Sequence, residues 1–159
     1  MSDEERQTSD RGVTLRFRVA MIDVDVVQIH FAAYFQWMDR GLQEILMQPG
    51  AISMGQMLAA GYGMPMVAIR CAYFKPARLG DVIEMKSHII RCGSSSFDVE
   101  HIFFNEQGER IAEGVTTQVF IELASQRAVP LPEWLRALCS ESSTPEHTGD
   151  KQEGAIADE

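Results

Sequence analysis

Hydrophobic positions recur with helical spacing in one long stretch of the chain and alternate with polar positions in several shorter ones. Large apolar side chains recur every three to four residues from Phe31 to Leu46, and a Pro-Gly pair follows shortly afterwards. This spacing predicts a helix with a broad apolar stripe that ends before the proline. A shorter helix is predicted between Ser53, which opens a capping-box pattern, and Gly61.

Apolar stretches on both sides of these helices predict five strands. The strands are expected at residues 13–20, 66–74, 82–91, 97–104 and 110–122. Turn residues separate them, and Asn105 to Gly108 has the composition of a hairpin turn. A short C-terminal helix is predicted over residues 130–138, with a proline at its start.

This order of elements favours an α+β fold. A long helix with a broad apolar stripe needs a sheet to cover it, and the strands supply one. We therefore predict a single hotdog domain, a five-stranded antiparallel sheet wrapped around a long central helix. Such a sheet leaves edge strands and a helix flank that are commonly covered by association of copies, so a homodimer or homotetramer is expected.

Charge and composition divide the 159 residues into one domain and two polar ends. The domain is expected at 12–140, between a disordered N-terminus at 1–11 and an acidic disordered tail at 141–159. Of the net charge of −9, the tail carries −5 and the N-terminus −2. The domain holds a local positive excess that suits a small anionic ligand and does not suggest nucleic acid, namely Arg70, Lys75, Arg78, Lys86 and Arg91.

The three cysteines are scattered and show neither a CxxC motif nor the spacing of a metal site. Cys71, Cys92 and Cys139 are therefore expected to be reduced thiols in a cytoplasmic protein. The acidic N-terminus is unlike a signal peptide, and no apolar run is long enough to span a membrane. Neither a membrane partner nor a metal ion is predicted.

The densest chemistry lies where the first strand gives way to the long helix. Asp23 and Asp25 precede the helix closely, and His30 stands directly before its first residue, Phe31. The first N–H groups of a helix have no partner within the helix, and its dipole favours negative charge there. No Ser, Thr, Asn or Asp occupies the position before Phe31, so these donors are predicted to be free for a substrate oxygen.

Two segments resemble the 4-hydroxybenzoyl-CoA thioesterase and YbgC-like family of hotdog acyl-CoA thioesterases. The first holds Asp23, Asp25, Tyr34, Trp37 and Asp39, similar to the family pattern D-x-D followed by Y-x-x-W/F-x-D/E on the helix. The second reads Ala72-Tyr-Phe-Lys75-Pro76-Ala-Arg78-Leu-Gly80-Asp81, similar to the family turn Y-x-x-P-A-x-x-G-D. The resemblance covers roughly residues 13–122.

The resemblance implies hydrolysis of an acyl- or aroyl-CoA thioester, with coenzyme A as part of the substrate and no separate cofactor. Asp25 would be the nucleophile or general base, and N–H groups near His30 and Phe31 would form the oxyanion hole. His30 is also a candidate catalytic side chain. The substrate-binding residues are expected to be Tyr34, Lys75, Arg78, Arg91 and Ser95. An acyl-carrier protein could replace CoA as the thiol.

Two alternatives remain open at this point. The spacing from Asp25 to His30 matches the hotdog enoyl-CoA hydratase motif D-x-N-P-[LIV]-H, although Val27 and Gln28 replace its Asn and Pro. The chain could also be a hotdog protein that binds an acyl group without catalysis. Asp23 and Asp39 are alternative acids if Asp25 is not the catalytic one.

Overall fold

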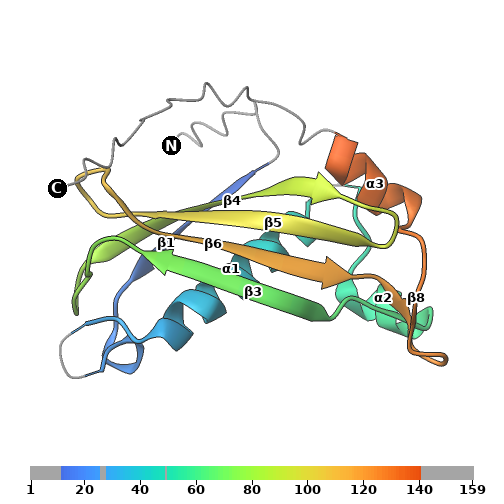
Figure 1. Ribbon diagram of the computed structural model, residues 1–159, viewed down its shortest axis with the longest axis horizontal. Helices are drawn as coiled ribbons and strands as arrows, with labels where there is room; N and C mark the ends of the chain where they lie inside the picture. Colours follow the sequence, from blue (N-terminus) through green and yellow to red (C-terminus); the bar gives the residue numbers. More distant parts are fainter. Residues whose placement is uncertain (1–11, 26–27, 49, 141–159) are drawn as a thin grey trace, which may run out of the picture.

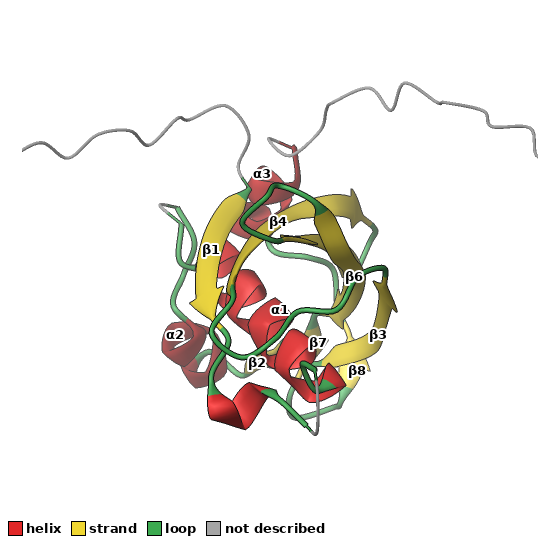
Figure 2. Ribbon diagram, turned by 90° about the vertical axis from the view of Figure 1, so that its left-hand side faces the viewer, coloured by secondary structure: helices red, strands yellow, loops and turns green. Residues whose placement is uncertain are grey.

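A five-stranded antiparallel sheet curves around a long central helix, as the sequence predicts (Figures 1 and 2). The computed structural model describes residues 12–25, 28–48 and 50–140, so both predicted disordered ends lie outside the described residues. The strands of the large sheet are β1 (Val13–Arg18), β3 (Met66–Tyr73), β4 (Val82–Cys92), β5 (Ser96–Phe104) and β6 (Arg110–Val119). Their order is β1-β4-β5-β6-β3, so β1 and β3 form its edges.

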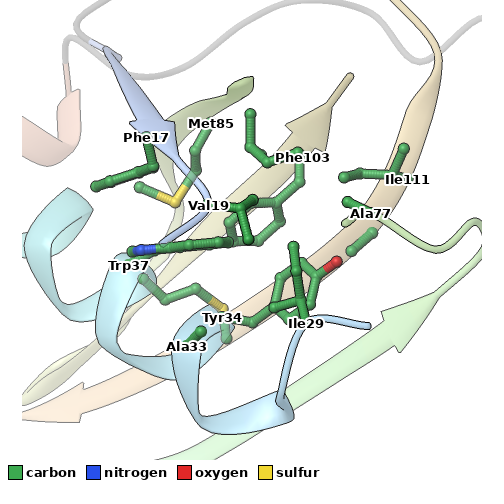
Figure 3. Packing of buried hydrophobic residues seen from close by; sticks show 13 residues of the cluster. Phe17, Val19, Ile29, Ala33, Tyr34, Trp37, Ala77, Met85, Phe103 and Ile111 are labelled. Carbon is green, nitrogen blue, oxygen red and sulfur yellow. The ribbon is translucent and has the colours of Figure 1, made fainter. Parts of the chain in front are cut away.

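The central helix α1 (Phe31–Leu46) packs its apolar stripe into the concave side of this sheet (Figure 2). The Trp37 ring stacks on Phe17 of β1 with centroids 5.1 Å apart, and Tyr34 meets Phe103 of β5 edge to face (Figure 3). Aromatic pairs in these geometries stabilise a core beyond the area that they bury. Helix and sheet are thereby fixed to each other near the start of α1.

The smaller elements were only partly predictable. The predicted capping box opens α2 (Met54–Ala59), where Ser53 Oγ accepts the Gln56 N–H at 3.2 Å. A 3-10 helix η1 (Met21–Asp23) follows β1, and a small second sheet consists of β2 (Tyr62–Gly63), β7 (Ile121–Glu122) and β8 (Arg127–Ala128). The strand expected over 110–122 is divided into β6 and β7 at Phe120, whose N–H donates to the Ser95 carbonyl at 2.8 Å.

The C-terminal helix α3 (Glu133–Ser140) lies at the end of β4 (Figure 1), and its buried leucines belong to the same core cluster as Leu42, Ile45 and Leu46 of α1. Its Leu135 and Leu138 are buried. A disulfide bond joins Cys92 at the end of β4 to Cys139 of α3, so the expectation of reduced thiols is wrong for this pair. Cys71 is a free thiol. The two bonded residues are 47 positions apart and meet only through the fold.

A buried polar cluster interrupts the core between α1 and the middle of the sheet. His101 of β5 is fully buried, and its ring lies between the Ser87 hydroxyl at 2.7 Å and the Thr116 hydroxyl at 3.2 Å. Burial lowers the pKa of His101 to about 3, with a smaller contribution from His88. Gly41 of α1 lies directly over this cluster, where a Cβ would stand 2.5 Å from Ser87 Oγ.

Candidate active site

The turn between η1 and α1 brings Asp25 to the start of the helix. The Asp23 carboxylate is buried and accepts the Ala20 N–H at 2.8 Å, while its carbonyl accepts the His30 N–H at 2.6 Å. The Asp25 N–H donates to the Gln28 carbonyl at 3.0 Å, which closes a tight turn. Asp23 is therefore engaged in holding the turn, and the exposed carboxylate that the turn presents belongs to Asp25.

A cavity of about 410 Å³ lies between this turn, the start of α1 and the end of β3. Its volume falls in the range of small-molecule sites. The residues that line it are Asp25, Gln28, Ile29, Phe31, Tyr34, Tyr73, Phe74, Lys75, Pro76 and Ala77. The carboxylate suggested by the sequence, the helix start and several aromatic rings thus share one cavity.

The first turn of α1 is capped by a side chain that the sequence did not suggest. His30 is the N-cap residue, and its Nδ1 accepts the Ala32 N–H at 3.2 Å. The prediction that no side chain caps these donors is therefore wrong for Ala32. An imidazole is not among the common N-cap groups, which explains why the pattern was missed. Phe31 follows with its side chain 57% exposed and lines the cavity.

Two tyrosines form the inner wall of the cavity. The Tyr34 ring is buried and meets the Tyr73 ring edge to face with centroids 5.1 Å apart. Burial raises the pKa of Tyr34 to about 12, and the neighbouring Cys71 adds to this. Burial likewise raises the pKa of the Cys71 thiol. Burial also raises the pKa of Tyr73 to about 12, so both tyrosines are uncharged at neutral pH.

The predicted basic and polar contacts divide between the two ends of the sheet. Lys75 lines the cavity and forms an ion pair with Glu109, and the exposed Arg78 follows in the turn before β4. Arg91 stands near the far end of β4, where it donates two hydrogen bonds to Asp98, at 2.6 and 3.1 Å. Ser95 lies in the loop just beyond. The fold of one chain therefore does not bring Arg91 and Ser95 to Asp25.

The remaining acidic candidate lies outside this cavity. Asp39 is exposed on the polar side of α1, where its carboxylate accepts the Gln43 amide N–H at 2.7 Å. Within the ranges 12–25, 28–48 and 50–140, no group of three or more His, Cys, Asp or Glu side chains could hold a metal ion. The helices in the same ranges include none that is long and apolar enough to cross a membrane.

Six lining residues were not singled out from the sequence as site residues, namely Gln28, Ile29, Tyr73, Phe74, Pro76 and Ala77. Tyr73 and Phe74 stand inside the segment that resembles the family turn, directly before Lys75. The signal was therefore present, but only the fold shows that the end of β3 lies against α1. Gln28 faces the cavity because the turn that it closes with Asp25 places both at its rim.

The fold and the family comparison together place this protein among the thioesterases of the hotdog class. A family model described as the thioesterase-like superfamily matches residues 19–138, and the chain belongs to that superfamily. The matched residues include the turn, α1, the whole cavity wall and most of α3.

Relatives of known name support the same class. A 1,4-dihydroxy-2-naphthoyl-CoA hydrolase of Thermosynechococcus vestitus is 25% identical over 126 residues, which are 79% of this chain and 84% of that protein. A 1,4-dihydroxy-2-naphthoyl-CoA thioesterase from Synechocystis has the same fold, with a TM-score of 0.75 at 20% identity over 84% of this chain and 99% of that one. A gentisyl-coenzyme A thioesterase also has this fold, with a TM-score of 0.69 at 25% identity. The match covers 78% of this chain and 99% of that one.

Proposed function

We propose that this protein hydrolyses an aroyl-CoA thioester, or an acyl-CoA thioester of similar shape, in the cavity at the start of α1. One observation carries the proposal: Asp25 and the first residue of α1 line the same cavity of about 410 Å³. A carboxylate that can act as nucleophile or base and the positive end of a helix dipole, facing one space, are sufficient to cleave a thioester.

The thioester carbonyl would lie between these two groups. The Asp25 carboxylate either attacks the carbonyl carbon to form an anhydride, which water then hydrolyses, or removes a proton from an attacking water. Both routes place negative charge on the carbonyl oxygen and release the CoA thiolate, which takes up a proton. N–H groups in the first turn of α1 would stabilise that charge.

The walls of the cavity favour an aromatic acyl group. Four of the ten lining residues carry aromatic rings, namely Phe31, Tyr34, Tyr73 and Phe74. Such rings offer stacked or edge-to-face contacts to an aromatic acid. The names of the Thermosynechococcus relative and of the gentisyl-coenzyme A thioesterase indicate aromatic acyl groups as well.

The CoA portion would extend from the cavity past Lys75 and Arg78. These two cations flank Pro76 and Ala77 of the cavity wall and suit phosphate groups. Arg91 lies near the other end of β4 and Ser95 just beyond it, so they would contact the same CoA only from a second copy. The edge strand β3 is open to such a copy, in keeping with the expected homodimer or homotetramer.

The hydratase alternative receives no support from the helix start. That chemistry needs the His30 imidazole and a carboxylate to activate one water together. In the structure the Nδ1 atom of His30 accepts the Ala32 N–H, so only Nε2 of this ring could activate water. We therefore keep hydration of a double bond as the alternative, which consumption of an unsaturated acyl-CoA without release of thiol would favour.

The proposal is tested by a matched pair of carboxylate variants in an assay of free-thiol release. Asp25→Asn should lower kcat/KM by at least about 100-fold, because the amide neither attacks a carbonyl nor removes a proton. Asp39→Asn, on the outer side of the same helix, should stay within about twofold of wild type. Full activity of Asp25→Asn would contradict the mechanism. If neither wild type nor any variant releases thiol, an acyl-binding role is favoured.

A further inference from the structure

A side chain caps one of the N–H groups at the N-terminus of α1 that the proposed reaction would use. The Ala33 N–H already donates to the His30 carbonyl at 3.0 Å, as in an ordinary first turn. Phe31, the first residue of α1, lines the cavity, and the neighbouring N–H, that of Ala32, donates to His30 Nδ1 at 3.2 Å. An N–H group donates one good hydrogen bond, so it cannot serve His30 and a thioester oxygen fully at once.

The position of His30 makes this contact replaceable. The His30 main chain is fixed, because its N–H donates to the Asp23 carbonyl at 2.6 Å. The imidazole is partly exposed and lies against the exposed Phe31 ring, with centroids 4.3 Å apart. The ring makes this contact through Nδ1 as the acceptor. The side chain can therefore turn away about χ1 without disturbing the backbone of the helix start.

We infer that His30 is a displaceable cap, which holds the Ala32 N–H in the free enzyme and yields it to the thioester oxygen during the reaction. This inference rests on the proposed function. An oxyanion is a stronger acceptor than either a neutral imidazole or a neutral carbonyl, so displacement is most favourable as charge develops. The exchange therefore favours the transition state over the bound substrate. His30 is then a positioning residue and not an acid or base.

The inference predicts that stability and activity change in opposite directions in a series of caps. His30→Ala leaves the Ala32 N–H free, so the melting temperature should fall while kcat/KM rises. The rise should be up to about fivefold, the ratio that corresponds to the free energy of one cap hydrogen bond. His30→Asn supplies a common cap residue, which the thioester oxygen would also have to displace. Its stability should be at least that of wild type, and its kcat/KM should be equal to or lower than that of wild type.

A second cap serves as the matched control. Ser53 caps α2 by accepting the Gln56 N–H at 3.2 Å, and it does not line the cavity. Ser53→Ala should therefore lower the melting temperature without raising kcat/KM. Hydrogen exchange at the Ala32 amide without substrate checks the cap itself, with protection expected in wild type and His30→Asn and lost in His30→Ala.

The outcomes separate this inference from the proposed function. If both His30 variants lose more than about 100-fold in kcat/KM, His30 is an acid or base and the inference is overturned. If His30→Ala loses stability and activity together and His30→Asn restores both, the cap is purely structural and the inference is again overturned. Wild-type release of thiol in either case leaves the proposed function standing, whereas wild-type failure on every thioester overturns both.

Discussion

Single residues decide how closely α1 approaches the sheet. Gly41 faces the Ser87–His101 pair, and Gly114 of β6 faces Met38, so neither position has room for a Cβ. Two glycines thus let a helix lie directly on a sheet whose middle carries polar side chains. The sequence contains both glycines, but nothing in their spacing distinguishes them from turn glycines, so this contact could not be predicted.

Gly41→Ala is expected to destabilise the protein by about 1 to 3 kcal/mol. The new Cβ would displace Ser87 Oγ, 2.5 Å away, and weaken the hydrogen bond of a buried histidine. Gly55→Ala in α2 is the control, because a Cβ there would stand 4.0 Å from the nearest atom, and it should stabilise by about 0.5 to 1 kcal/mol. Urea unfolding measures both; equal effects would contradict this packing.

His101 should make the protein less stable as the pH falls. Its pKa is about 3 in the fold and about 6.5 in the unfolded chain, so the unfolded state binds the extra proton between these values. Stability is therefore complete above pH 6.5 and declines below it, by about 2 kcal/mol from pH 7 to pH 5. Urea unfolding at the two pH values tests this, and His101→Asn should show a smaller decline. A wild-type profile that is flat over this window would refute it.

At the scale of elements, the long periodic segments were predictable and the short ones were not. The stripe from Phe31 to Leu46 gave the bounds of α1, and the five strands of the large sheet lie within a few residues of their expected ranges. The strands β2, β7 and β8 have two residues each, too few to show any period. The Cys92–Cys139 bond was missed because it depends on where α3 docks.

The disulfide is expected to hold α3 on the sheet. It closes a loop of 47 residues, and loss of such a link typically costs about 2 to 4 kcal/mol of stability. Reductant should lower the urea midpoint of wild type, while the double variant Cys92→Ser/Cys139→Ser should start low and not respond. Cys71→Ser keeps the link and should still respond to reductant. Equal midpoints of wild type with and without reductant would show that the bond does not support the fold.

At the scale of the molecule, the fold brings some of the predicted site residues together and separates others. Asp25, Phe31, Tyr34 and Lys75 line one cavity at the start of α1, and His30 caps the helix there. The position of His30 before the helix was visible in the sequence, but its contact with Ala32 could not be predicted from residue offsets. Arg91 and Ser95 lie at the far end of the sheet, because a sequence shows which residues are basic or polar but not at which end of a strand they gather.

The most direct test of the central claim is thiol release from two CoA esters by wild type and Asp25→Asn. Benzoyl-CoA and straight-chain hexanoyl-CoA compare an aromatic acyl group with an aliphatic one of similar size. The account predicts that wild type releases thiol from both, at a higher kcat/KM from benzoyl-CoA, and that Asp25→Asn loses nearly all of either activity. Release by Asp25→Asn at the wild-type rate, or no release from any CoA ester by wild type, would contradict it.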